Sequence, residues 1–154
     1  MPPLRPMRQG ALDWVQLFTR FDGRISRRPF WTAFLALLAV EIIGQMLAYQ
    51  IEGDRLGAIV DLAFTYPEFA LFTKRAHDRD MPTWLVGIFF AMSVLMNFLV
   101  VVGWSGKMDE PDPFTLIILV PWLIFAIALL IDLGFRRGTS GPNRYGPDPL
   151  QKSA

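Results

Sequence analysis

Three long apolar stretches dominate the pattern of hydrophobic and polar positions along the chain. Residues 84–104 and 114–131 contain no charged side chain, and residues 31–49 contain a single one, Glu41. As a helix, the first stretch is about 30 Å long, which matches the hydrocarbon core of a bilayer. In a soluble protein, three such helices would leave no amphipathic elements to cover them. The pattern therefore predicts an integral membrane protein.

A fourth apolar segment, residues 56–72, is shorter and contains Asp61, Pro67 and Glu68. Lysine and arginine concentrate in cytoplasmic loops, so their distribution decides whether this segment spans. If it does, 13 of the 15 basic residues fall on one side of the membrane; if it does not, they divide almost equally. The sequence therefore predicts an all-α fold with both termini in the cytoplasm. The four transmembrane helices are expected at residues 30–49, 56–73, 84–104 and 114–134.

The segments outside the four spans are short. Apolar residues between Ala11 and Phe21 recur at helical spacing, which predicts an amphipathic helix over residues 11–22. Such a helix would lie in the membrane interface or pack as a cap under the bundle, and the sequence leaves both open. From residue 135 to 154, closely spaced glycines and prolines predict an irregular cytoplasmic tail. The whole chain is then a single membrane domain.

Composition excludes several kinds of chemistry. The chain has no cysteine and one histidine, which rules out disulfides, thiol catalysis and any metal site that needs two imidazoles. The formal net charge is +1, and this gives no reason to expect nucleic-acid binding. We therefore expect no catalytic residue, metal site, cofactor or nucleic-acid partner. In the predicted topology, this small net charge is a sum of opposite contributions: the cytoplasmic segments are positively charged, and the spans and outer loops are negatively charged.

Four carboxylates lie within the predicted spans: Glu41, Asp61, Glu68 and Asp132. Each should face protein, water or an opposite charge, because an ionised carboxylate in hydrocarbon is costly. Asp132 can pair with Arg136 one turn on, Glu68 can extend toward Arg75, and Asp61 can reach the outer interface. Glu41 has no such partner. The alternative interpretation is a path for protons or cations through the bundle.

Three polar strings flank the spans at the predicted cytoplasmic side. "GRISRRPFW" (residues 23–31) precedes the first span; here Ser26 suits a helix N-cap, the arginines would face anionic headgroups, and Phe30 and Trp31 would anchor at the interface. "KRAHDRDMPTW" (residues 74–84) interleaves opposite charges with His77. We interpret this loop first as a structural polar network and second as a ligand site. "GPNRYGPDP" (residues 141–149) is an unusually specific string for a tail.

These three strings, in this order, resemble the hallmarks of the bacterial domain of unknown function 805 family over roughly residues 11–149. The resemblance implies a small, multi-pass inner-membrane protein with cytoplasmic polar motifs. Ala76 stands where the family has a leucine, and Arg79 and Asp80 stand where small residues usually follow. By matched position, the resemblance carries over Gly23, Arg24, Ser26, Arg27, Trp31, Arg75, His77, Asp78, Trp84, Asn143, Arg144 and Gly146.

Because all three strings fall on one side of the membrane, we expect them to pack together as a polar platform under the bundle. Asp78 would then pair with Arg24 or Arg144. The candidates for binding lipids or a partner protein are Arg24, Ser26, Arg27, Arg28, Trp31, Arg75, His77, Asp78, Trp84, Asn143 and Arg144.

The leading functional hypothesis is a non-enzymatic accessory or scaffolding subunit that docks onto another membrane complex or its lipids. The alternative is a small transporter or ion-conducting oligomer that uses Glu41 and Asp61. A membrane enzyme acting on lipids comes third, and it would depend on His77, Asp78 and Asp80. The sequence is also compatible with a homo-oligomer.

Overall fold

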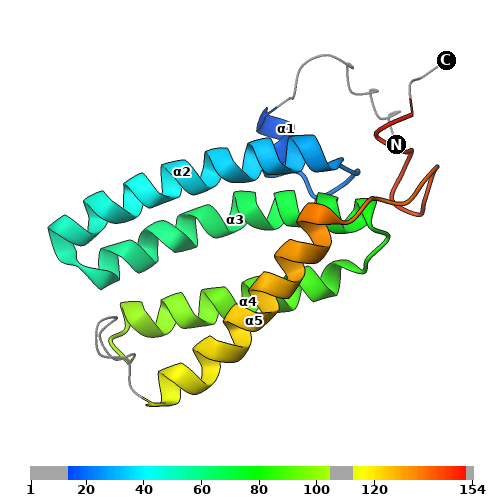
Figure 1. The fold of residues 1–154 in the computed structure, drawn as a ribbon. Helices are drawn as coiled ribbons and strands as arrows, with labels where there is room; N and C mark the ends of the chain where they lie inside the picture. The colour runs from blue at the N-terminus through cyan, green and yellow to red at the C-terminus, as the bar shows by residue number, and fades with distance from the viewer. Residues whose placement is uncertain (1–13, 105–112, 152–154) are drawn as a thin grey trace, which may run out of the picture.

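The computed structural model describes residues 14–104 and 113–151, which form helices joined by short connections and followed, after residue 135, by the predicted irregular tail (Figure 1). Four helices are long and apolar enough to cross a membrane, which agrees with the four predicted spans, the doubtful second one included. The helices are α1 (Trp14–Thr19), α2 (Arg27–Glu52), α3 (Asp54–Asp78), α4 (Thr83–Val101) and α5 (Pro113–Phe135).

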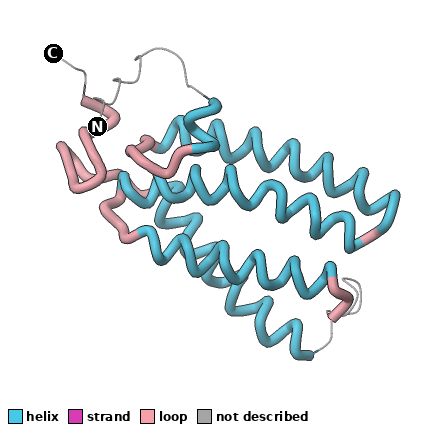
Figure 2. Tube along the Cα trace, turned by 180° about the vertical axis from the view of Figure 1, so that it is seen from behind, coloured by secondary structure: helices cyan, strands magenta, loops and turns pink. Residues whose placement is uncertain are grey.

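The four long helices form an antiparallel bundle in which α3 is central. It packs along α2 on one side and along α4 on the other. Helix α5 crosses α4 obliquely, and the end of α5 meets the beginning of α2. The turn between α2 and α3 is the single residue Gly53, whose φ of 68° suits glycine. The α1–α2 connection, the α3–α4 turn and the tail all gather at one end (Figure 2). We refer to it as the cytoplasmic end, following the predicted topology.

Two helix boundaries differ from the predicted ones in a way that matters for the site. Helix α2 begins at Arg27, directly after Ser26, whose extended backbone (φ −77°, ψ 171°) is that of an N-cap although its side chain makes no capping hydrogen bond. Helix α3 continues to Asp78 and does not end at residue 73. Lys74, Arg75 and His77 therefore lie on the last turns of a helix and not in a loop. Their polar side chains are accommodated there because each finds a partner inside the protein.

The hydrophobic core lies at the cytoplasmic end of the bundle. The ring of Phe72 contacts those of Phe30, Phe34 and Phe90, with centroids 5.3, 5.6 and 5.6 Å away. Around them are buried side chains from all five helices, among them Leu17, Val86 and Leu133. Elsewhere the outer faces of α2, α4 and α5 expose many large apolar side chains, as expected where lipid replaces water.

Helix α1 is shorter than predicted, and residues 11–13 of the predicted helix lie outside the described residues. Leu17 is buried against the bundle, whereas Val15 is 71% exposed. The hydroxyl of Tyr66 on α3 donates to the carbonyl of Thr19, at 2.9 Å. Helix α1 therefore caps the bundle with one face and presents Trp14 and Val15 outward with the other, so it combines features of both interpretations left open by the sequence.

Candidate functional site

The last two turns of α3 form the centre of the polar platform. Every residue from Ala70 to Asp78 is buried, including three cationic or imidazole side chains and an aspartate. A helix end of this composition normally faces water. Here it is enclosed by α1, the α1–α2 connection, the end of α5 and the tail, all of which supply hydrogen-bonding groups.

Asp78 lies between two buried arginines. Arg24 Nη2 is 3.0 Å from Asp78 Oδ1, and Arg75 pairs with the other carboxylate oxygen. The predicted pairing of Asp78 with Arg24 is therefore present. Arg24 also donates to the backbone carbonyls of Thr139 and Gly141, both at 2.8 Å, and so joins the tail to α3.

Arg75 and Lys74 bind the carboxyl ends of two other helices. Arg75 Nε donates to the carbonyl of Leu133 and its Nη2 to that of Arg136, both at 2.5 Å. Lys74 Nζ donates to two carbonyls in the last turn of α1, at 2.6 and 2.7 Å. Because the last carbonyls of a helix lack intrahelical donors and carry partial negative charge, cations there are well placed.

His77 is held from both sides of its ring. Its Nδ1 is 3.1 Å from the carbonyl of Gly23 and its Nε2 is 2.9 Å from the hydroxyl of Thr83. A carbonyl can only accept, so Nδ1 carries a proton. Tyr145 stacks on the imidazole with centroids 3.8 Å apart, and the Asn143 amide donates to the backbone carbonyl of His77 at 2.8 Å.

More exposed ion pairs surround this buried network. Arg79 and Arg136 both pair with Asp132, at 3.2 and 2.8 Å, so the predicted Asp132–Arg136 pair is present and is shared with the α3–α4 turn. Arg144 pairs with Asp80 at 3.1 Å and not with Asp78. The platform is therefore bonded internally, which leaves few of its motif side chains free for a ligand.

Several expected interface residues lie elsewhere. Arg24 is buried and does not face headgroups, and Phe30 is a fully buried core residue and not an interface anchor. Trp84 is 61% exposed on the first turn of α4. Arg27 and Arg28 are exposed. Trp31 does lie at a helix contact, where its Nε1 donates to the carbonyl of Gly134 at 2.9 Å.

The platform uses four residues that were not among the predicted binding candidates: Lys74, Gly138, Thr139 and Tyr145. A β-carbon at Gly138 would overlap the Asp78 carboxylate, so the tail can pass there only as glycine. The backbone amide and hydroxyl of Thr139 donate to the carbonyl of Asp78, at 2.8 and 3.2 Å. Lys74 and Tyr145 lie within the polar strings, and this position could have identified them. Gly138 and Thr139 precede the third string, and no sequence pattern pointed to them.

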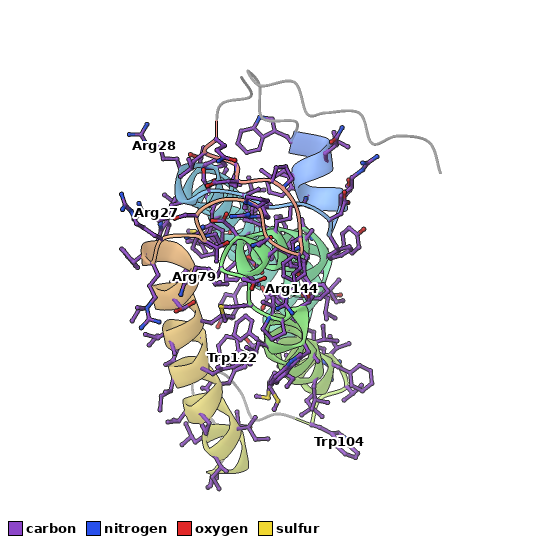
Figure 3. The ribbon with its side chains drawn as sticks, turned by 90° about the vertical axis from the view of Figure 1, so that its right-hand side faces the viewer. Arg27, Arg28, Arg79, Trp104, Trp122 and Arg144 are labelled. Carbon is purple, nitrogen blue, oxygen red and sulfur yellow. The ribbon has the colours of Figure 1, made fainter. Side chains whose placement is uncertain are left out.

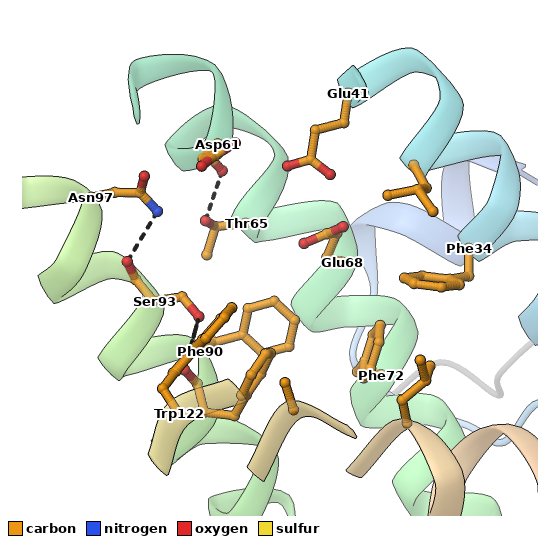
Figure 4. A pocket seen from close by; sticks show the side chains of 14 residues that line it. Phe34, Glu41, Asp61, Thr65, Glu68, Phe72, Phe90, Ser93, Asn97 and Trp122 are labelled. Atoms are coloured by element: carbon orange, nitrogen blue, oxygen red, sulfur yellow. Dashed lines mark hydrogen bonds between the residues drawn. The ribbon is translucent and has the colours of Figure 1, made fainter. Parts of the chain in front are cut away.

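A second site, a cavity of about 290 Å³, lies within the membrane part of the bundle (Figure 4). Its polar lining is Glu41, Asp61, Thr65, Glu68, Ser93 and Asn97. Its aromatic lining is Phe34, Phe72, Phe89, Phe90 and Trp122. All four long helices contribute, so the cavity is a property of the bundle and of no single helix.

The polar lining follows helical spacing. Asp61, Thr65 and Glu68 lie on one face of α3, and Phe72 continues that face toward the cytoplasmic end. On α4, Asn97 Nδ2 donates to the carbonyl of Ser93 at 3.1 Å. Because α3 and α4 run in opposite directions, their polar residues share the outer half of the cavity and their phenylalanines the inner half.

For Asp61 and Glu68 the structure differs from the separate arrangements that the sequence favoured, and it groups both with Glu41, which the sequence left without a partner. Glu41, Asp61 and Glu68 line the same cavity, and Figure 4 shows the carboxylates of Glu41 and Glu68 pointing toward one another. Glu68 does not extend to Arg75, which pairs with Asp78. Asp61 does not reach the interface but accepts a hydrogen bond from Gln45 on α2. Only Asp132 is arranged as expected.

Chemically, the cavity combines proton-accepting groups with hydroxyl and amide partners. Trp122 Nε1 donates to the hydroxyl of Ser93 at 3.1 Å, which orients that side chain toward the space. Within the described residues, no three carboxylate or histidine side chains are close enough together to hold a metal ion. Carboxylates beside hydroxyl and amide groups can take up a proton or associate with a cation.

The model of one protein family, described as "Protein of unknown function (DUF805)", matches residues 18–147. The chain is also similar to three proteins of Escherichia coli strain K12. The uncharacterized protein YiiR is 32% identical over 136 residues, which cover 83% of this chain and 84% of YiiR. The inner membrane protein YhaH is 25% identical over 148 residues (90% and 97%), and the inner membrane protein YhaI is 27% identical over 143 residues (92% and 95%).

No solved structure matches the chain. The family match covers more than four fifths of the sequence and includes the first two polar strings and residues 141–147 of the third. The relatives' inner-membrane assignment agrees with the four helices that are long and apolar enough to span. The chain therefore belongs to the DUF805 family, proteins of unknown function, and is a multi-pass protein of the inner membrane.

Proposed function

We propose that this protein is a small non-enzymatic transporter or ion-conducting membrane protein. Glu41, Asp61 and Glu68 would take up a proton or a small cation within the bundle. The observation that carries the proposal is the single cavity that these three carboxylates line. A carboxylate near the bilayer centre costs about 3 kcal/mol even on lenient scales, so three around one space favour a functional role.

The distribution of lining residues supports access from the outer side. Among the cavity's polar groups, Asp61 and Thr65 lie in the outer half of α3 and Ser93 and Asn97 in the outer half of α4, while Glu68 lies just on the cytoplasmic side of the middle of α3. Toward the cytoplasm, Phe72 packs against Phe34 and Phe90. We interpret the phenylalanines as a closed inner layer and the acidic part as a vestibule. Transport would require this layer to rearrange.

The bonding of the platform supports a non-enzymatic role. The third hypothesis, a lipid-directed enzyme, would depend on His77 and Asp78. Both ring nitrogens of His77 are engaged, and Asp78 is shared between Arg24 and Arg75. Side chains held in this way are poorly suited to bind a substrate or transfer a proton to it.

An accessory or scaffolding role is a second proposal, favoured by the apolar side chains exposed on α2, α4 and α5, which could contact another membrane protein as well as lipid. It has less support than the transport proposal, because the motif residues expected to dock a partner mostly bind one another. Purification from native membranes in a mild detergent tests it. A stoichiometric larger complex would favour the accessory role, and a homo-oligomer or monomer would favour transport.

Ion flux tests the transport proposal. The purified protein is reconstituted into liposomes that contain a pH-sensitive dye, and a potassium diffusion potential drives proton uptake; a sodium gradient with tracer tests cations. We expect uptake above that of empty liposomes. Glu41→Gln and Glu68→Gln should reduce it to the background rate, because each replaces a titratable carboxylate by a neutral group of similar size.

Glu52→Gln provides the matched control, since Glu52 is exposed at the end of α2 and outside the cavity. This variant should transport like the unmodified protein. Gel filtration and circular dichroism check that all three variants keep the fold. A flux equal to that of empty liposomes for every ion, or equal flux in all variants, would contradict the proposal.

A further inference from the structure

Exposed arginines gather where α2 begins and α5 ends. Most basic side chains at the cytoplasmic end donate inside the protein or pair with aspartates: Arg24, Lys74, Arg75, Arg79, Arg136 and Arg144. Arg27, Arg28 and Arg137 are exposed and make no ion pair with a carboxylate of the described residues. Figure 3 shows Arg27 and Arg28 on the side of the bundle occupied by α5.

Specific contacts hold the two helix ends together. Arg27 Nη1 donates to the carbonyl of Phe135 at 3.2 Å, and Arg136 and Arg137 follow Phe135 directly. The rings of Trp31 and Phe135 meet edge to face, with centroids 5.4 Å apart. We call Arg27, Arg28, Arg136 and Arg137 the arginine cluster, because their positions in the chain place them at the cytoplasmic edge of the α2–α5 seam, next to the Trp31–Phe135 pair. Arg136 keeps an exposed side chain although it pairs with Asp132.

The seam is apolar on its membrane side. Phe135 is 63% exposed, and one helical turn deeper Leu35 on α2 and Ile131 on α5 are 55% and 52% exposed. Cations, then aromatic rings, then aliphatic side chains thus follow one another from the cytoplasmic end into the bilayer. This spatial order of side chains complements an amphiphile with an anionic head and hydrocarbon chains.

We propose that the α2–α5 seam binds an anionic glycerophospholipid of the inner leaflet. The arginine cluster binds its phosphate, and its acyl chains lie along Leu35 and Ile131. Guanidinium groups match phosphate oxygens in geometry as well as charge, and basic sites between transmembrane helices suit anionic headgroups. The proposal involves residues distinct from those of the acidic cavity and holds whether or not the protein transports ions.

Native mass spectrometry of the detergent-purified protein tests this site. Phosphatidylglycerol is titrated and compared with phosphatidylcholine of the same acyl chains. We expect tighter binding of phosphatidylglycerol. One arginine near an anionic lipid strengthens binding about fivefold, so Arg28→Gln/Arg137→Gln should weaken it on the order of 25-fold. Arg20→Gln/Arg55→Gln removes the same charge from two exposed positions outside the seam and should leave the affinity unchanged.

Three results would overturn the proposal. Equal affinity for both lipids would show that the headgroup charge is not recognised. Equal weakening in both double variants would show that binding follows total charge and not the seam. Displacement of the lipid by inorganic phosphate alone would assign the cluster to a free anion. Selective loss in the seam variant, with phosphate ineffective, supports it.

Discussion

At the scale of single residues, Asp78 holds the platform together. Its one negative charge lies between the guanidinium groups of Arg24 and Arg75, both buried with it. The remaining positive charge is stabilised by backbone carbonyls, including those of Leu133 and Thr139. Because the carbonyls belong to the end of α5 and to the tail, one aspartate links three segments that are distant in the sequence.

Asp78→Asn should therefore destabilise the protein strongly. An asparagine keeps the size of the side chain but leaves two buried arginines without a counter-charge. Removing one partner of a buried ion pair costs about 3–5 kcal/mol. Thermal unfolding in detergent, followed by intrinsic tryptophan fluorescence, measures the effect.

Asp80→Asn serves as the comparison, since Asp80 pairs with Arg144 at the surface, where both side chains are about half exposed. An exposed pair contributes at most about 1 kcal/mol. If the two variants unfold at the same temperature, Asp78 does not have the central role that its contacts indicate.

At the scale of helices, sequence patterns predicted the spans and missed how their faces meet. Length and low charge identified three of the four transmembrane helices, and the distribution of basic residues identified the second one. The position of Asp61 and Glu68 on one face of α3 was readable from their spacing. The sequence did not show that this face meets Glu41 on α2, because the rotation of each helix about its axis depends on side-chain packing between helices. The buried end of α3 was missed because its polar residues have partners in the tail, far along the chain.

The contact between α2 and α5 depends on Gly134. A β-carbon there would lie 2.6 Å from Cζ2 of Trp31, so Gly134→Ala should push α5 away from α2. Overpacking of this kind costs about 1–3 kcal/mol. Gly87→Ala is the control, because nothing lies within 4 Å of the added carbon and alanine is the better helix former, by up to about 1 kcal/mol.

Unfolding temperatures in detergent compare the two alanine variants. Gly134→Ala should unfold earlier than the unmodified protein, and Gly87→Ala at the same temperature or later. A Gly134→Ala variant as stable as the Gly87→Ala variant would mean that close packing at the α2–α5 seam contributes little to stability.

At the scale of the whole molecule, the bundle has two different halves. The cytoplasmic half contains the aromatic core and the internally bonded platform. The acidic cavity, lined by all four long helices, begins at this core and extends into the outer half, where Asp61, Thr65 and Asn97 lie. We interpret the first half as a rigid base that holds the helices in register. The second half is then the functional part, a vestibule that opens to the outer side.

Cysteine accessibility tests this arrangement most directly, and the chain's lack of native cysteine allows single-cysteine variants without further changes. Thr65→Cys and Asn97→Cys place the thiol in the cavity. Trp104→Cys, at an 82% exposed outer position, is the positive control, and Leu95→Cys, on an exposed apolar face of α4, is the lipid-facing one. A membrane-impermeant maleimide is added to spheroplasts and, separately, to inside-out vesicles.

The account predicts that Thr65→Cys and Asn97→Cys react in spheroplasts and not in inside-out vesicles, because Phe34, Phe72 and Phe90 close the cytoplasmic side of the cavity. Trp104→Cys should react in spheroplasts, and Leu95→Cys in neither preparation. If the two cavity cysteines react only in inside-out vesicles, or in neither preparation while Trp104→Cys is labelled, the cavity is not an outward-facing vestibule and the central claim is wrong.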